Sequence, residues 1–240
     1  MDAMLDMLRW SVVLGVLAVV GVVVGRGYRR QRAHPLIHLP TPSLPISEYR
    51  SIDDLLGLID EPAASACRRI LEDNRRLFET VQGSSHNHQN WPGGYADHVA
   101  EVMNLAVILH ARFDSVRPLP FSLSDALLIV YLHDVEKPWK YESDPNGGLR
   151  KVASLHDKHA QRAFRERKLR EYGVVLTADQ HNALTYVEGE YKDYSNKHRV
   201  MGPLAAFCHL CDVTSARIWF DCPKEENDPW PGACRIRQAR

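Results

Sequence analysis

The segment "ALLIVYLHDVEKPW", residues 126–139, places His133 and Asp134 directly after a run of apolar residues. Burying two adjacent polar side chains is costly unless a partner satisfies them. Ser122 can cap a helix that begins just before this run, and the apolar character on every side predicts that the helix lies centrally in the fold. The segment therefore raises the question of what satisfies a histidine and an aspartate at the end of a buried helix.

Two other apolar segments each carry a polar side chain of the same kind. His98 lies on an apolar stripe of the helix expected over residues 95–113, and Asp212 follows "LAAFCHLC" in the helix expected over residues 202–220. A buried histidine alone is usually a hydrogen-bonded core residue, and a buried aspartate alone is usually a cap or half of an ion pair. Four such groups on three helices favour a shared divalent metal ion, because Mn, Fe, Co, Ni and Mg accept mixed nitrogen and oxygen ligands.

The helical period of 3.6 residues also runs through the other segments of this part of the chain. These segments are residues 51–60, 62–81, 153–173 and 176–190. No segment shows a clear alternation of apolar and polar residues, and no internal repeat is visible. We therefore predict an all-α helical bundle that covers residues 47–222.

The order of His98, the pair His133 and Asp134, and then Asp212 resembles the HD superfamily of metal-dependent phosphohydrolases. The matching motifs are "GGYADH", "LHDVEK" and "LCDVTSAR". The resemblance covers about residues 47–222 and implies an HD-domain bundle in which these four side chains bind one or two divalent ions. It also implies a hydrolase that uses water activated by the metal to cleave a phosphate ester, with a nucleotide as the expected substrate.

Two finer matches concern the local geometry of the site. The segment "HNHQNWPGGYADH" is similar to a His-rich segment of HD exoribonucleases, and His88 falls at a matching position. His88 also lies in a glycine-flanked loop that we expect to border the cleft, where it would contact the substrate. The segment "DVTSAR" is similar to a stretch in some HD ribonucleases and marks Ser215 and Arg217. Lys137 and Arg217 are expected to contact a phosphate and assist catalysis, the alternatives being a surface lysine and a plain salt bridge. Asp134 is the expected bridging ligand if a second ion binds.

Relatives with two metals have further histidines between the HD pair and the last aspartate. His159, in "DKHAQ", is the best match for such a ligand, with His156 and His181 as the other candidates. Where these relatives have another histidine, this chain has Val187 or Glu188. Valine cannot bind a metal and glutamate can, so the number of ions stays open.

Three functions are compatible with these residues. The first is a metal-dependent phosphohydrolase acting on a nucleotide or a related phosphate ester. The second is a 3'-5' exonuclease on short single strands, and the third is a non-catalytic module that senses a metal or a nucleotide. Lys and Arg number 30 and Asp and Glu also number 30, so the chain lacks the basic excess of most nucleic-acid-binding proteins, and we expect no duplex partner.

The N-terminal region differs from the rest in composition. Residues 10–25, "WSVVLGVLAVVGVVVG", carry no charge, and a membrane span needs roughly 20 apolar residues. We predict a single-pass anchor over residues 1–25 and a basic, proline-rich linker over residues 26–46. Because arginines follow the apolar run, the positive-inside rule predicts a cytoplasmic catalytic domain. A signal peptide is the alternative interpretation.

The cysteines and the C-terminus complete the prediction. The five cysteines are an odd number with irregular spacing, which favours a reducing compartment over a disulfide framework. Cys208 and Cys211 form a CxxC pair that we interpret as one face of a buried helix. Residues 223–240 are polar and contain proline, so we expect an irregular tail.

Overall fold

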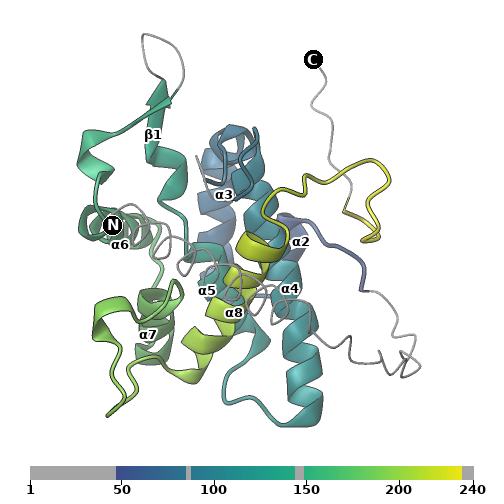
Figure 1. The fold of residues 1–240 in the computed structure, drawn as a ribbon, viewed down its shortest axis with the longest axis vertical. Helices are drawn as coiled ribbons and strands as arrows, with labels where there is room; N and C mark the ends of the chain where they lie inside the picture. The colour runs from purple at the N-terminus through teal and green to yellow at the C-terminus, as the bar shows by residue number, and fades with distance from the viewer. Residues whose placement is uncertain (1–46, 85–87, 144–148, 234–240) are drawn as a thin grey trace, which may run out of the picture. The chain divides into compact units, whose positions relative to one another are not determined.

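The computed structural model of the protein describes residues 47–84, 88–143 and 149–233, and these residues are mostly helical (Figure 1). The predicted all-α class is confirmed for them. The helices are α2 (Ile52–Leu56), α3 (Ala63–Thr80), α4 (Gly94–Val116), α5 (Leu123–Leu132), α6 (Lys158–Glu171), α7 (Ala178–Tyr186) and α8 (Pro203–Ile218). Short 3-10 turns lie at η1 (Lys137–Trp139), η2 (Ala153–Leu155) and η3 (Tyr191–Asp193).

Helix α5 lies at the centre, in contact with α4 and α8 (Figure 1). It begins with a capping box, in which the Ser122 hydroxyl accepts from the Asp125 N–H at 3.0 Å and the Asp125 carboxylate accepts from the Ser122 N–H at 3.0 Å. Its side chains from Ala126 to Leu132 are all buried. Each fully buried leucine or isoleucine stabilises the fold by about 1.5–3 kcal/mol. The helix ends at Leu132, so the polar pair that follows is held in the interior by this packing.

Helix α4 begins at two glycines that allow a close approach of the chain. Gly93 precedes the helix with a φ of 79°, which is a left-handed conformation that glycine adopts without strain. A side chain at Gly94 would place its Cβ 2.0 Å from the Gln89 carbonyl oxygen. This contact holds the loop before α4 against the start of the helix, and His88 in that loop lies next to His98.

Helix α8 begins with Pro203 in its first turn, where a missing N–H costs nothing. Cys208 and Cys211 are buried free thiols on the face of α8 that packs against the core. The interpretation of the CxxC pair as one face of a buried helix is confirmed. Burial raises the pKa of the Cys211 thiol to about 12, so this side chain is neutral at ordinary pH.

Arg165 joins α6 to α7 and to the turn after α5, while α7 itself packs against α5 and α8. Its guanidinium lies 3.5 Å from the Glu136 carboxylate and donates to the carbonyl oxygens of His133 and, at 3.4 Å, Leu184. Arg165 and Glu136 are both buried. This arginine therefore ties α6 and α7 to the turn that carries the polar pair.

A small antiparallel hairpin, absent from the sequence prediction, precedes α6. Strand β1 (Tyr141–Ser143) pairs with β2 (Leu149–Lys151), with Tyr141 opposite Lys151. Strands of three residues are too short to display an alternating pattern, which explains why the hairpin was not predicted.

The C-terminal segment over residues 223–233 has no helix or strand, as predicted, but it packs onto the bundle. The Trp230 indole N–H donates to the Ser47 carbonyl at 2.8 Å, and the Tyr49 N–H donates to the Pro231 carbonyl at 2.6 Å. Lys224 lies against the Tyr49 ring, with its ammonium 4.1 Å from the ring centroid. The compact unit therefore continues past residue 222, the end that the sequence suggested.

The predicted membrane anchor over residues 1–25 and the linker over residues 26–46 lie outside the described residues. Among residues 47–84, 88–143 and 149–233, no helix has the length and apolar character needed to cross a membrane. The predicted single-pass membrane location is corrected on this finding.

Candidate metal centre

Two buried histidines from different elements face each other. His98 lies in the second turn of α4, and His133 directly follows α5. Their Nε2 atoms are 3.3 Å apart, and both side chains are at most 1% exposed. The Nδ1 of His133 donates to the Val130 carbonyl at 2.6 Å, while the Nδ1 of His98 lies 3.0 Å from the Ser215 hydroxyl. Each ring is thus held on its outer side, and both Nε2 atoms point at the same space.

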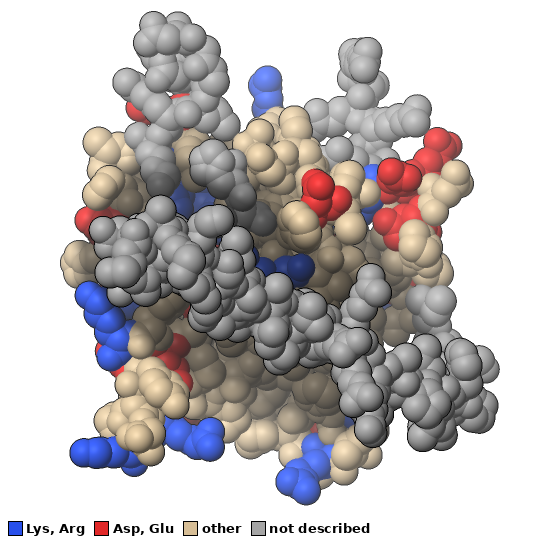
Figure 2. Space-filling view, viewed as in Figure 1, with Lys and Arg blue, Asp and Glu red and all other residues tan. Residues whose placement is uncertain are grey.

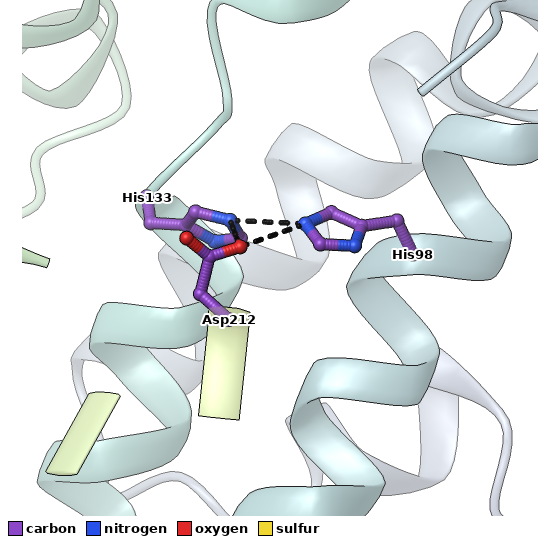
Figure 3. Close-up of side chains that lie close together, drawn as sticks. All are labelled: His98, His133 and Asp212. Atoms are coloured by element: carbon purple, nitrogen blue, oxygen red, sulfur yellow. Dashed lines mark hydrogen bonds and ion pairs between the residues drawn. The ribbon is translucent and has the colours of Figure 1, made fainter. Parts of the chain in front are cut away.

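Helix α8 brings a carboxylate to this space. The Asp212 Oδ1 lies 3.2 Å from the His98 Nε2 and 3.5 Å from the His133 Nε2 (Figure 3). His98, His133 and Asp212 therefore form a compact group that could hold a metal ion. The convergence of side chains from α4, the end of α5 and α8, which the sequence predicted, is observed.

Asp134 reaches the same group from the side. Its Oδ2 lies 3.1 Å from the His133 Nε2 and 3.7 Å from the His98 Nε2. The same oxygen forms an ion pair with the Lys137 ammonium one turn later. Asp134 therefore lies beside the group of His98, His133 and Asp212, and its carboxylate is paired with Lys137.

Charge in the cluster is balanced by opposing effects. Burial lowers the pKa of His98, and the Asp212 carboxylate offsets only part of that effect. Burial acts in the same direction on His133, but the carboxylates of Asp134 and Asp212 outweigh it and raise the pKa of His133 well above its usual value. Burial opposes ionisation of Asp134, yet Lys137 and His133 hold the pKa of its carboxyl well below the usual range. His133 is therefore protonated while His98 is neutral.

The donor set and its spacing fit a divalent ion. Ligand atoms that share one ion at about 2.0–2.2 Å lie roughly 3–3.6 Å from one another. The distances between the Nε2 atoms and the Asp212 oxygen, 3.2–3.5 Å, fall in this range. Because a ligand imidazole must be neutral, metal binding would release the His133 proton.

His88 lies over the edge of the cluster. Its Nδ1 is 2.5 Å from the Gln89 Oε1, which can only accept, so this nitrogen carries the proton. The other ring nitrogen, Nε2, lies 3.3 Å from the Lys137 ammonium. Burial, followed by the nearby Lys137 charge, lowers the pKa of His88 to about 3. The sequence placed His88 at the substrate, and the structure brings it next to Lys137 as a neutral acceptor.

Sequence reasoning missed a buried polar network behind His98. The Ser215 hydroxyl donates to the Glu101 carboxylate at 2.6 Å, and the Gln89 amide lies 3.3 Å from the same hydroxyl. All three side chains are buried. Glu101 is visible in the sequence as a charged residue within an apolar helix, three positions after His98. Nothing in the sequence marks Gln89, whose φ of 43° depends on the loop conformation.

Several predicted site residues do not join the cluster. His159 is exposed in the first turn of α6, and Arg217 is exposed in the last turn of α8. Arg217 follows Asp212 by five residues, which places it about 140° around the helix from the carboxylate. Val187 is buried in the apolar core, and Glu188 pairs with Lys158. The structure therefore does not bring the fifth predicted ligand, His159, or the predicted phosphate contact of Arg217 to the site.

Comparison of the chain with family models, with curated proteins and with solved structures finds no match.

Proposed function

We propose that this protein is a metal-dependent phosphohydrolase of the HD type that acts on a nucleotide or a related phosphate ester. The observation that carries the proposal is the convergence of His98, His133, Asp134 and Asp212 on one space between α4, the end of α5 and α8. Ionisable groups are almost never fully buried without a partner or a function. The order of these residues along the chain, which resembles the HD superfamily, supports the same assignment.

Each side chain has a separate role in the proposed site. A divalent ion held by His98, His133 and Asp212 would lower the pKa of water and polarise a phosphoryl oxygen. Lys137 supplies a fixed positive charge at the rim, where it can contact a phosphate after partial release from Asp134. His88 presents its Nε2 on the same side, next to Lys137, and can accept a hydrogen bond from a water or from a substrate hydroxyl.

The surface favours a small substrate. Basic and acidic side chains are interspersed on the described part of the face seen in Figure 2. Tracking a long single strand requires a continuous positively charged groove. The distribution of charge therefore supports a nucleotide-sized ester over the exonuclease alternative, which we keep as an arm of the test.

The test uses the full chain, stripped with a chelator and reloaded with Mn²⁺, Co²⁺, Ni²⁺ or Mg²⁺. The substrates are nucleoside monophosphates, nucleoside triphosphates, cyclic dinucleotides and a labelled single-stranded oligonucleotide. We expect turnover in one nucleotide class, a loss of at least about 100-fold in His98→Asn, and full activity in the matched variant His181→Asn, which changes an exposed histidine.

Three outcomes would change the assignment. Cleavage of the oligonucleotide alone would favour the exonuclease. Tight metal binding without turnover of any substrate would favour the sensing module. Undiminished turnover in His98→Asn would refute the proposed site.

A further inference from the structure

Glu101 is a buried carboxylate that has no role in the proposed chemistry. It lies on α4 three residues after His98, so the two side chains lie on neighbouring positions of one helical face. Its Oε1 accepts a hydrogen bond from the Ser215 hydroxyl at 2.6 Å and lies 3.4 Å from the Gln89 amide nitrogen. This carboxylate therefore connects α4, α8 and the loop before α4 behind the proposed metal centre.

Counting donors and acceptors fixes the direction of each hydrogen bond. A serine hydroxyl has one hydrogen and two lone pairs. When Glu101 is ionised, its carboxylate can only accept, so the hydrogen of Ser215 goes to it. The lone pairs then take the Gln89 amide, 3.3 Å away, and the Nδ1 of His98, 3.0 Å away. The proton of neutral His98 must therefore lie on Nδ1, which leaves the lone pair of Nε2 pointing at the cluster.

The orientation of the Gln89 amide agrees with this direction. Its nitrogen lies 3.4 Å from the Ser215 carbonyl and 3.5 Å from the Trp219 carbonyl, and both oxygens can only accept. The amide oxygen therefore faces His88, as described above. One network thus sets the proton positions of His98, through Ser215, and of His88, through Gln89.

The position of the His98 proton matters because a second acceptor, Asp212, favours the other ring nitrogen. The Asp212 carboxylate lies 3.2 Å from the His98 Nε2 and favours a proton on that nitrogen. A proton there would block the lone pair that a metal needs. We propose that Glu101 is a positioning residue that, through Ser215, holds the His98 proton on Nδ1 and so keeps Nε2 available as a metal ligand. This inference rests on the proposed function only in taking His98 as a ligand.

His133 offers an internal contrast. Its Nδ1 donates to the Val130 carbonyl, and the direction of this hydrogen bond is fixed because a backbone carbonyl can only accept. The Nδ1 of His98 depends instead on a hydroxyl whose hydrogen can point in either direction. A protonated Glu101 can donate to Ser215, which frees the hydroxyl hydrogen to turn toward His98 and moves the imidazole proton to Nε2. The inference thus predicts that His98, and not His133, responds to a change at Glu101.

The surroundings of Glu101 place this change near neutral pH. Burial raises the pKa of Glu101 to about 7, while the hydrogen bond from Ser215 and the charge of Lys224 oppose the rise. Asp97 and Asp228 add to it, and Tyr49 is the remaining titratable group that faces this carboxylate. Rising pH ionises Glu101 and favours the proton position that leaves Nε2 free.

The first measurement is the tautomer of His98 in the metal-free full chain, by ¹⁵N NMR of histidine-labelled protein, with the His98 signals assigned by their loss in His98→Asn. We expect the Nδ1–H form in the wild type at pH 8 and a shift toward the Nε2–H form in Ser215→Ala and Glu101→Ala. Glu101→Gln, whose amide oxygen still accepts, should keep the Nδ1–H form. The matched control is Thr214→Ala, because the Thr214 hydroxyl donates at 2.7 Å to the Leu210 carbonyl of its own helix.

The second measurement is Mn²⁺ affinity by calorimetry between pH 6 and 8. Ser215→Ala and Glu101→Ala should weaken binding by about 10- to 100-fold, the usual effect of losing an outer partner of a ligand histidine. Glu101→Gln should keep an Mn²⁺ affinity close to that of the wild type but lose the part of its pH dependence that is centred near pH 7. Thr214→Ala should match the wild type in both respects. An Nε2–H form in the wild type, or an unchanged tautomer in both alanine variants, would overturn the inference. Absence of Mn²⁺ binding to the wild type would refute the proposed function, while the NMR result would still decide the role of Glu101.

Discussion

Histidines occupy two contrasting regions of the described chain. In the centre formed by α4, α5 and α8, His98 and His133 are at most 1% exposed and both face the Asp212 carboxylate of α8. Along α6 and α7, His159 and His181 lie in the first turns of their helices and are exposed. The same residue type is therefore buried against carboxylates in one region and exposed to solvent in the other.

The difference follows from the composition of the helices. Helix α5 has no polar face, so a polar side chain at its end can only be satisfied by another buried group. Helix α6 is rich in charged residues, and its histidine is exposed. A histidine within an apolar stretch of sequence therefore indicates a functional site more strongly than a histidine within a charged stretch. Four changes break or sharpen this contrast.

The largest expected effect is on metal binding at the centre. Asp212→Asn removes a charged ligand atom, so we expect Mn²⁺ affinity of the full chain to fall by more than about 100-fold, beyond the range typical of outer contacts. The matched control is Asp179→Asn, which changes an aspartate in the first turn of α7. Calorimetric titration measures both. An affinity in Asp212→Asn within about threefold of the wild type would exclude this cluster as the site.

The second change removes the arginine that joins α6 to the turn after α5 and to α7. Arg165→Leu leaves the buried Glu136 carboxylate and the His133 and Leu184 carbonyls without their partner. Breaking a buried ion pair from one side typically costs about 3–5 kcal/mol. Urea unfolding should show a loss of this size, whereas Arg170→Leu, an exposed arginine of the same helix, should change the free energy of unfolding by less than about 0.5 kcal/mol. A small effect at Arg165 would mean that α6 is held by other contacts.

The third change concerns stability against pH. Burial raises the pKa of Glu101 from 4.5 to about 7, so the folded chain binds this proton more tightly than the unfolded chain. The resulting stabilisation is complete below pH 4.5 and is lost as pH rises through about 7, and it amounts to roughly 2–3 kcal/mol. Glu101→Gln should remove this component, so the difference in unfolding free energy between the variant and the wild type should increase in favour of the variant from pH 5 to pH 8. A difference that is constant over this range would contradict the raised pKa.

The smallest expected effect is at the exposed histidine of α6. His159→Asn should leave Mn²⁺ affinity and the free energy of unfolding unchanged, to within about 0.5 kcal/mol, because the side chain contacts solvent. Calorimetry and urea unfolding on the full chain measure both quantities. A clear loss of metal affinity would restore His159 to the ligand set that the sequence suggested.

Much of the central region could be anticipated from the sequence. The apolar runs around His98, His133 and Asp212 predicted both the helices and the inward direction of these side chains. The sequence did not anticipate the packing of Trp230 onto the start of the folded unit. Contacts between the two ends of the unit depend on where the chain returns after the last helix, and no local pattern encodes that return.

Local periodicity determined which face of each helix is buried, because that depends only on the 3.6-residue repeat and on the solubility of each side chain. It therefore identified His98, His133, Asp134 and Asp212 as inward-facing groups. Only the tertiary structure decided that Glu101, Ser215 and Gln89 form a network behind His98, and that His159 and Arg217 point away. The reason is physical: the meeting of side chains from distant segments depends on how helices cross and on how a loop such as residues 88–94 is held, and these are properties of the whole packed bundle.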